Sequence, residues 1–378
     1  MKRKRPMKIV VIVAAVMIGL PILAVIILLA VRQYGSSRLN DHKPAAADAD
    51  TGVYTLKATD GIVLLEDHLL AVRYDGDYGF DAFLEAGGAE RDSDILSFFS
   101  SYFGSTAAFR SDSSAFGCST VSVKNTDGGY LFGRNFDFRP CDAMIVELHP
   151  KNGYASLSTV DLDFLYLGSG LRSSAMSDQV LTLAAAYVPL DGINEKGLCI
   201  SVNMIQDGET IQQDTGKPDL TTTTAIRLVL DKAATVEEAI SLLSSYDLHA
   251  SFNFMVHFAI ADAEGNSVVV EYIGNEMTVT KTPVVTNFYL TPGAKFGIGT
   301  AQSMTRYHML TESIGDDPEM IREDVRDLLE SVSKHHFNDG ETTEWSVVFD
   351  QTALTADYYH REDYTKVFRL KLSGEQGV

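Results

Sequence analysis

The stretch from Cys118 to Asp137 constrains the fold of this chain more than any other. Residues 119–123 alternate polar and apolar side chains, as a half-buried strand does, and residues 125–129 (Asn-Thr-Asp-Gly-Gly) carry turn chemistry. Residues 130–132 then read as a returning strand. A hairpin of this length brings Arg134 and Asp137 back beside Cys118. A thiol next to a guanidinium and a carboxylate is a candidate nucleophile, because a cationic neighbour favours the thiolate.

The same residues also have a structural interpretation. Free cysteines are commonly buried in cores, and Arg134 with Asp137 could form an ordinary ion pair at a strand end. An internal cysteine nucleophile would also need a separate base, usually histidine. A cysteine that begins a new chain supplies its own α-amino group, whose ordinary pKa of about 7.7–8.0 suits proton transfer at neutral pH.

The segment resembles the choloylglycine hydrolase and acid ceramidase superfamily of N-terminal nucleophile amidases. In that family the nucleophilic cysteine is followed by an arginine 16 residues on and an aspartate 19 residues on, which are the spacings of Arg134 and Asp137 from Cys118. Further matching motifs cover most of residues 118–378: Asp191-Gly-Ile-Asn-Glu-Lys-Gly-Leu198, Val284-Val-Thr-Asn287, Arg306 and Trp345-Ser-Val-Val.

The resemblance implies an α+β fold, a four-layer αββα sandwich, and self-cleavage between Gly117 and Cys118. It assigns the nucleophile to Cys118, the orientation of its α-amino group to Asp137, and the polarisation of the thiol and substrate region to Arg134. The matching asparagine of the family, Asn287, is an oxyanion-hole donor.

Two further site residues follow from the resemblance with different support. Arg306 resembles a late active-site arginine of the family. An active-site asparagine of the bile-salt branch lies on the strand after Asp191, where direct alignment gives Met204. Neighbours on a strand face opposite sides, so Asn203 is a candidate only if a bulge intervenes.

The N-terminus predicts a membrane anchor. The first seven residues form a basic tail, and Ile9 to Val31 contain 23 residues without a charge, long enough to span a bilayer at ~1.5 Å per residue. A cleavable signal has a shorter apolar region and a small-residue site soon after it; we favour an uncleaved anchor over 8–32 against a lipoprotein-like or cleaved signal. Basic residues before the span should stay cytoplasmic, which predicts a single-pass cell-membrane protein with its catalytic domain outside.

Composition divides the rest of the chain. Residues 33–50 predict a flexible linker, 51–117 a structured pro-segment or small subunit, as in the acid ceramidase branch, and 118–378 the catalytic domain. Residues 1–32 hold six Lys and Arg and no acids, and the remainder carries 25 Lys and Arg against 51 Asp and Glu. So acidic a surface argues against nucleic acid as a partner.

Helices are expected over residues 94–103, 225–234, 236–246 and 319–333.

The remaining reactive residues give weaker signals. Three cysteines are too few for a disulfide framework; Cys141 and Cys199 read as buried thiols, although a bridge between them stays open. No metal-ligand spacing stands out, the adjacent His335 and His336 included, and no cofactor is implied.

These observations predict an autoprocessed cysteine amidase that hydrolyses linear carbon–nitrogen amide bonds of small N-acyl compounds. Conjugated bile acids, N-acyl amino acids, penicillin V-like amides and fatty-acyl amides remain open as substrates. The alternatives are an acyltransferase of the isopenicillin N type, which also has a Gly-Cys junction after a pro-segment, and a catalytically silent surface binding domain. The sequence leaves homo-oligomerisation open.

Overall fold

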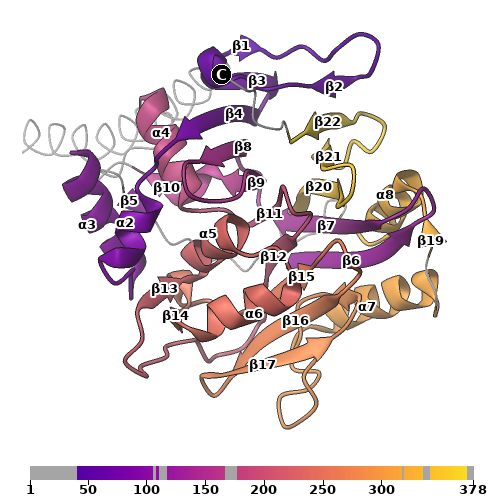
Figure 1. Ribbon diagram of the computed structural model, residues 1–378. Helices are drawn as coiled ribbons and strands as arrows, with labels where there is room; N and C mark the ends of the chain where they lie inside the picture. Colours follow the sequence, from indigo (N-terminus) through magenta and orange to yellow (C-terminus); the bar gives the residue numbers. More distant parts are fainter. Residues whose placement is uncertain are drawn as a thin grey trace, which may run out of the picture.

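Two β-sheets pack face to face and carry helices on their outer surfaces (Figure 1). A computed structural model describes residues 41–104, 108–109, 117–166, 177–316, 319–334 and 341–372. The chain therefore has the expected α+β architecture of helix, sheet, sheet and helix layers. Within these residues no helix is long and apolar enough to cross a bilayer; the predicted anchor at 8–32 lies outside them, as do His335 and His336.

The first sheet has ten strands in the order β1-β3-β4-β8-β9-β11-β12-β15-β16-β17. Their bounds are β1 Lys43–Pro44, β3 Val63–Glu66, β4 Leu69–Gly76, β8 Ala143–Pro150, β9 Ser156–Asp161, β11 Asp191–Asn194, β12 Cys199–Met204, β15 Val256–Ala261, β16 Ser267–Ile273 and β17 Glu276–Lys281.

The second sheet has eight strands, ordered β18-β6-β7-β20-β21-β22-β2 with β19 also paired to β6. Their bounds are β2 Val53–Tyr54, β6 Gly117–Asn125, β7 Tyr130–Phe138, β18 Val284–Val285, β19 Glu319–Met320, β20 Thr342–Asp350, β21 Thr355–His360 and β22 Phe368–Lys371. Two short ribbons complete the strands: β5 Ala108–Phe109 with β10 Leu165–Tyr166, and β13 Asp219–Thr221 with β14 Asp247–His249.

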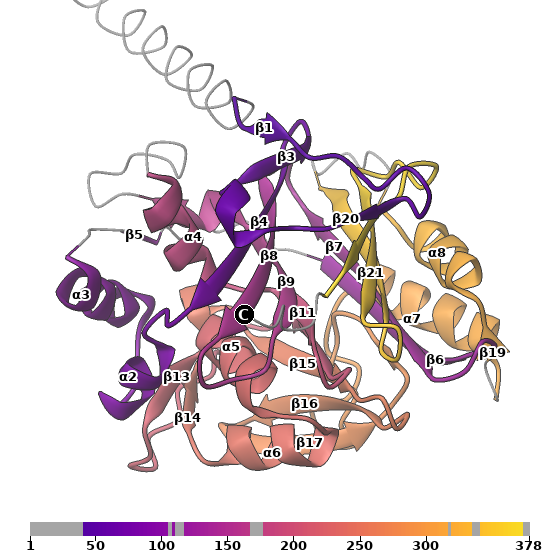
Figure 2. The same ribbon diagram turned by 45° about the horizontal axis from the view of Figure 1, so that its top comes forward.

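Helices cover both outer surfaces. Their bounds are α2 Phe80–Glu85, α3 Asp92–Phe103, α4 Asp178–Ala186, α5 Thr222–Lys232, α6 Val236–Ser244, α7 Ala301–Ile314 and α8 Arg322–Ser331. Figures 1 and 2 show α2 to α6 on the side of the ten-stranded sheet, and α7 and α8 on the side of the eight-stranded sheet. The apolar faces of both sheets meet in one large core, which seals the space between them.

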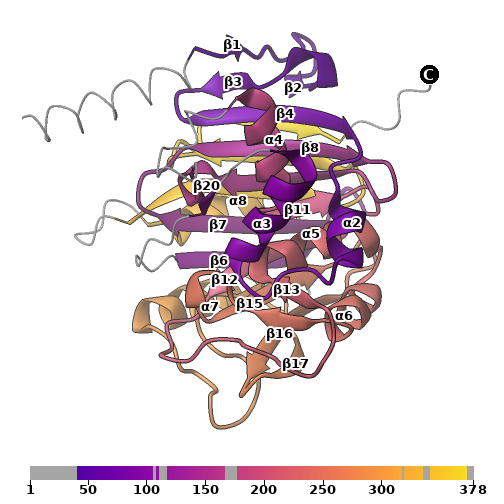
Figure 3. The same cartoon turned by 90° about the vertical axis from the view of Figure 1, so that its left-hand side faces the viewer.

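The segment before Cys118 is an integral part of both sheets. Strand β4 lies inside the ten-stranded sheet and pairs with β8 in parallel over eight residues, from Leu69 opposite Ala143 to Gly76 opposite Pro150. Strand β2 pairs with β22 at the edge of the other sheet. Figure 3 shows β4 beside β8, with α2 and α3 in front of the sheet. Residues 43–44, assigned by sequence to the linker, form β1 and pair with β3.

The predicted hairpin is confirmed. β6 and β7 pair in antiparallel register from Gly117 opposite Asp137 to Lys124 opposite Tyr130. The turn between them closes through the Asn125 and Gly129 backbones, 2.9 Å from nitrogen to oxygen. The helix expected from residue 319 is wrong at its start: Glu319 and Met320 pair with β6 as β19, and α8 begins at Arg322.

Candidate active site

The hairpin register distributes the candidate residues over two faces of the eight-stranded sheet. Cys118 lies opposite Phe136 and Thr120 opposite Arg134, whereas Gly117 lies opposite Asp137. Because side chains alternate along a strand, Cys118 and Arg134 point toward the ten-stranded sheet. Asp137 points the other way, toward the layer of α7 and α8. The site therefore has an inner half around the thiol and an outer half around the carboxylate.

In the inner half, Arg134 joins the thiol to the ten-stranded sheet. Its guanidinium lies 3.5 Å from Cys118 Sγ and donates to the Val202 carbonyl at 2.9 Å and to Asp191 Oδ2 at 2.8 Å. It also donates to the Leu190 carbonyl. Arg134 and Asp191 are fully buried. Buried charges need fixed partners, and the surrounding carbonyls and carboxylate supply them for Arg134. The environment of Arg134 therefore differs from that of an ordinary exposed ion pair at a strand end.

The Cys118 thiol is itself fully buried and donates toward the Val202 carbonyl at 3.6 Å. Burial raises the pKa of the Cys118 thiol above its ordinary value of 9.0; the Arg134 guanidinium opposes this effect and the Asp137 carboxylate adds to it. The expected thiolate-favouring effect of Arg134 is present, but burial outweighs it. The thiol of the uncut chain is therefore protonated at neutral pH and needs a base.

The second sequence motif supports this inner half. Asp191, at the start of β11, accepts a hydrogen bond from Trp345 Nε1 at 2.9 Å as well as the one from Arg134. Trp345 in turn stacks on Phe136, with ring centroids 4.1 Å apart. Asn194 donates to two carbonyls at the end of α5, and Gly197 approaches Gln351 so closely that a Cβ would lie 2.3 Å from its carbonyl oxygen. The motif is thus a scaffold for Asp191.

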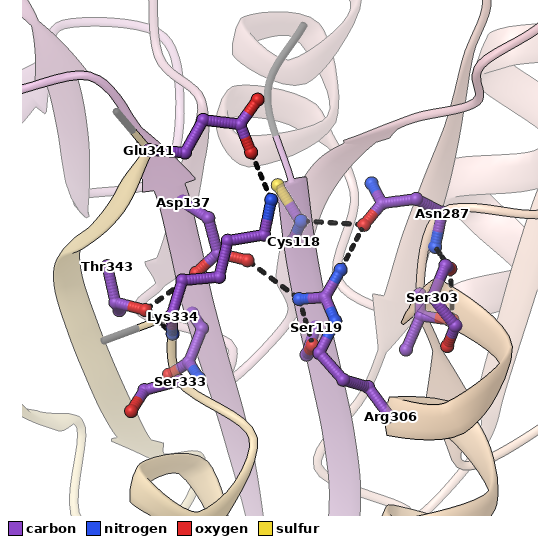
Figure 4. A network of polar contacts seen from close by, with 12 residues as sticks. Cys118, Ser119, Asp137, Asn287, Ser303, Arg306, Ser333, Lys334, Glu341 and Thr343 are labelled. Carbon is purple, nitrogen blue, oxygen red and sulfur yellow. Dashed lines mark hydrogen bonds and ion pairs between the residues drawn. The ribbon is translucent and has the colours of Figure 1, made fainter. Parts of the chain in front are cut away.

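The outer half centres on Asp137, which is fully buried between two donors. Arg306, on α7, donates from NH1 to Asp137 Oδ2 at 2.7 Å and to Ser119 Oγ at 2.9 Å. Thr343 Oγ1, on β20, donates to Asp137 Oδ1 at 2.7 Å. Figure 4 shows Arg306 lying between Asp137 and Asn287.

Asn287 connects the two halves at the edge of β6. It follows β18, whose pairing with β6 brings it beside Cys118. Its Oδ1 accepts from the Cys118 backbone nitrogen and from Arg306 NH2, both at 2.8 Å, and its Nδ2 donates to the Met204 carbonyl at 2.7 Å. These partners fix the amide orientation: two donors face Oδ1 and a carbonyl faces Nδ2. The hydrogen bond of the Cys118 nitrogen goes to Asn287 rather than to Asp137.

Asn203 lies on β12, which pairs with β15 residue by residue and without a bulge from Cys199 to Met204. Its fully buried side chain contacts Ser201 Oγ at 3.3 Å and the Val285 carbonyl at 3.4 Å. Asn203 therefore spans the two sheets. Met204 contributes its carbonyl oxygen, as the acceptor for Asn287.

Gly117 fits its position through lack of space. A Cβ on Gly117 would lie 2.8 Å from Asp137 Oδ2 and 3.2 Å from Lys334 Cε. Its φ angle lies outside the left-handed region. Close packing, rather than a left-handed backbone conformation, therefore accounts for a glycine at this position.

The structure thus brings together five predicted residues: Cys118, Arg134, Asp137, Asn287 and Arg306. The sequence interpretation missed Ser119 and Thr343. Short hydroxyl side chains carry no sequence pattern of their own. Cys141 and Cys199 are buried free thiols, as expected.

Fold and site together define the class: two β-sheets packed between helix layers, with a buried cysteine at the start of the β6–β7 hairpin. A family model, linear amide C–N hydrolases of the choloylglycine hydrolase family, matches residues 118–308, half of the chain. The chain belongs to this family.

Individual relatives are more distant. A bile salt hydrolase/transferase from Clostridium perfringens is 27% identical over 174 residues, 43% of this chain and 50% of that protein, so the match spans about half the length of the curated relative. A variant of conjugated bile acid hydrolase from the same organism superposes with a TM-score of 0.50 at 15% identity, over 68% of this chain and 92% of the other. Penicillin V acylase from Agrobacterium tumefaciens gives 0.48 at 18% identity, over 69% and 89%.

Proposed function

We propose that this chain is a self-cleaving amidase whose mature nucleophile is the N-terminal Cys118, formed by cutting the Gly117–Cys118 bond. The observation that carries the proposal is the Cys118 backbone nitrogen, held by Asn287 Oδ1 at 2.8 Å next to a protonated, buried thiol. The site needs a base for that thiol. Cutting the bond converts the same nitrogen into a free amine without moving it from its partner.

In the mature enzyme, the proposed roles follow the contacts. The free α-amino group takes the thiol proton as Cys118 Sγ attacks the acyl carbonyl, and returns it to the leaving amine. Water then hydrolyses the thioester. Asp137, through Arg306, fixes the position of Asn287. One N–H of Asn287 Nδ2 donates to the Met204 carbonyl, and the second donates to the oxyanion. One such contact typically stabilises the transition state by about 3–4 kcal/mol.

The acyl group of the substrate is proposed to be apolar. Leu190 and Val202, whose carbonyl oxygens accept from Arg134, present their side chains to an apolar cavity between α3 and β12. Ile95, Phe164 and Phe254 complete its apolar wall. An apolar wall favours the apolar acyl groups of bile-acid, fatty-acyl and penicillin V-type amides over charged ones, and the cavity of about 30 Å³ must widen to admit them.

The cut should leave unambiguous chemical signs. We expect active protein to contain two fragments, the larger starting Cys118-Ser-Thr, as measured by N-terminal sequencing and intact mass. Cys118→Ala should remain one inactive chain. In the uncut protein a thiol alkylating agent should spare Cys118, because it is fully buried. Full activity with an uncut 117–118 bond would refute the proposal.

A panel of acyl amides with and without alkylation separates the remaining functions. Release of free acid that the alkylating agent abolishes would support hydrolysis. Transfer of the acyl group to an added amine would support the acyltransferase alternative, which the name of the hydrolase/transferase relative also favours. Tight binding of the amides without either product would support a silent binding domain.

A further inference from the structure

A second charged pair lies at the bond that the proposed self-cleavage would cut. Lys334, three residues after the end of α8, is 5% exposed, and its ammonium contacts the Glu341 carboxylate. Figure 4 shows its side chain extending past Asp137 to Glu341. None of the roles assigned above to the amidase reaction uses this lysine.

The position of Lys334 is set by the outer half of the site. Its backbone nitrogen donates to Thr343 Oγ1 at 2.7 Å, and its carbonyl accepts from the Thr343 nitrogen at 3.2 Å. Thr343 Oγ1 also donates to Asp137 Oδ1. The chain at Lys334 is therefore tied to the same carboxylate that Arg306 holds.

Lys334 packs directly on the residue that supplies the carbonyl to be attacked. A Cβ at Gly117 would fall 3.2 Å from Lys334 Cε and 2.8 Å from Asp137 Oδ2. Gly117 is thus enclosed between a carboxylate and the end of a lysine side chain. Its own lack of a side chain is what lets the ammonium-bearing carbon approach the junction.

We propose that Lys334 promotes self-cleavage by placing a positive charge beside the Gly117 carbonyl. This role rests on the proposed self-cleavage. Cys118 Sγ bonds to the Gly117 carbonyl carbon, and the carbonyl oxygen takes up negative charge. The C–N bond then breaks as the thiol proton passes to the Cys118 nitrogen. Water adds to the resulting thioester, the S–C bond breaks, and a Gly117 carboxylate and a free Cys118 thiol and amine remain.

Local electrostatics favours this role. Asp137 brings a negative charge to Gly117, which would oppose a developing oxyanion, and Arg306 is already committed to that carboxylate. The Lys334 side chain is 6% exposed and that of its partner Glu341 18% exposed, so solvent screens the carboxylate more than the ammonium. Preorganised charge of this kind stabilises a transition state without reorganisation during the reaction.

The test follows cleavage of the full chain after cell-free synthesis in the presence of lipid vesicles, quenched over time and read by intact mass. Lys334→Met keeps the aliphatic packing and removes the charge; we expect cleavage at least tenfold slower. Lys334→Arg restores a charge and should recover most of the rate. Glu341→Gln keeps the ammonium and should be cut at least as fast as wild type. Lys366→Met, which removes an ammonium paired with Glu66 instead, should be cut normally.

A second readout separates cleavage from a structural role. Once Lys334→Met has been cut, its turnover of an acyl amide per N-terminal cysteine should match wild type, because the lysine acts on maturation. Equal cleavage rates for wild type and Lys334→Met would overturn the role of Lys334 alone. A loss of rate in Lys334→Arg as large as in Lys334→Met would also overturn it. A wild-type chain that is never cut would overturn the proposed function, and this role with it.

Discussion

Asp137 accepts hydrogen bonds from Arg306 and Thr343 on the outer half of the site. Asp137→Asn should lower both cleavage and turnover by about 10²–10⁴-fold, because it removes the charge that orients Arg306 and, through it, Asn287. As Asp137 is fully buried, the unfolding free energy should also fall, by about 1–3 kcal/mol. Urea unfolding and single-turnover assays measure the two effects.

The matched control for Asp137 is Glu319→Gln. Glu319 pairs with Lys124 at the surface, where both side chains are about half exposed, and the loss of such a pair costs about 0–1 kcal/mol. Near-normal turnover in Asp137→Asn would reject its place in the site.

His257 and Glu271 support Asn287 from the other side. The two His257 ring nitrogens lie 2.9 Å from Glu271 Oε1 and 2.7 Å from the Thr286 carbonyl. Burial opposes ionisation of Glu271, but the hydrogen bond and charge of His257 outweigh it. Together with the Leu290 N–H, they hold the pKa of Glu271 below its ordinary 4.5. The backbone just before Asn287 is thus held by His257, which is hydrogen-bonded to the buried Glu271.

Protonation of Glu271 at low pH should remove the stabilisation that its carboxylate provides. A carboxyl whose pKa is lowered in the folded state contributes stability that is full above about pH 4.5 and is lost as the pH falls through the lower folded value. In the uncut Cys118→Ala chain, we expect Glu271→Gln to be less stable than its parent at pH 7. The difference should shrink below pH 4.5, by about 1.4 kcal/mol per unit of pKa shift. Urea unfolding at both pH values measures this, and a difference that grows on acidification would contradict it.

Among the strands and helices, the sequence predicted those whose formation depends on neighbouring residues. The β6–β7 hairpin followed from alternation and a Gly-rich turn, and the helix expected from residue 236 begins at Val236 as α6. Two elements that shape the site did not follow. β4 begins with four successive apolar residues, without the alternation that marks a half-buried strand. α7 is polar on balance and buries Arg306 along with Leu310 and Ile314, so no apolar stripe marks it.

The site residues divide in the same way. Cys118, Arg134 and Asp137 lie within one hairpin, and their spacing alone predicts that they are neighbours at its open end, although not that Asp137 points to the other face. Asn287 and Arg306 reach them only through pairing of β18 with β6 and packing of α7, which are long-range events. A family resemblance could point to these two residues, but no local rule could.

The position of β4 predicts the fate of the first fragment. Residues 69–76 pair with β8 along their whole length, and Tyr78 donates to Asp231 on α5. After a cut at 117–118, removing residues 1–117 would take three strands, β1, β3 and β4, out of the ten-stranded sheet. We therefore expect both fragments to elute together in size-exclusion chromatography until denaturant is added, at the volume of uncut Cys118→Ala. Loss of the small fragment on washing would contradict this.

For the whole molecule, we propose that the basic tail and the apolar run 9–31 anchor the protein in the cell membrane with residues 33–378 outside. Full-length protein should sediment with membranes, and protease added to intact cells should reach the catalytic domain. A chain starting at residue 41, which keeps β1, should be soluble. A cytoplasmic marker serves as the control, and complete protection of the domain in intact cells would exclude this orientation.

Gly117 and Cys118 occupy adjacent buried positions at the start of one strand. In the proposed mechanism the attacking sulfur and the bond that it breaks therefore belong to the same molecule. The rate of cleavage per molecule does not depend on the protein concentration. Maturation should follow first-order kinetics from the moment at which the β6–β7 hairpin has folded. Its half-time should not change on dilution or with the level of expression, and no collision with a second molecule is required. A sparse protein tethered outside a cell could thus become active one molecule at a time.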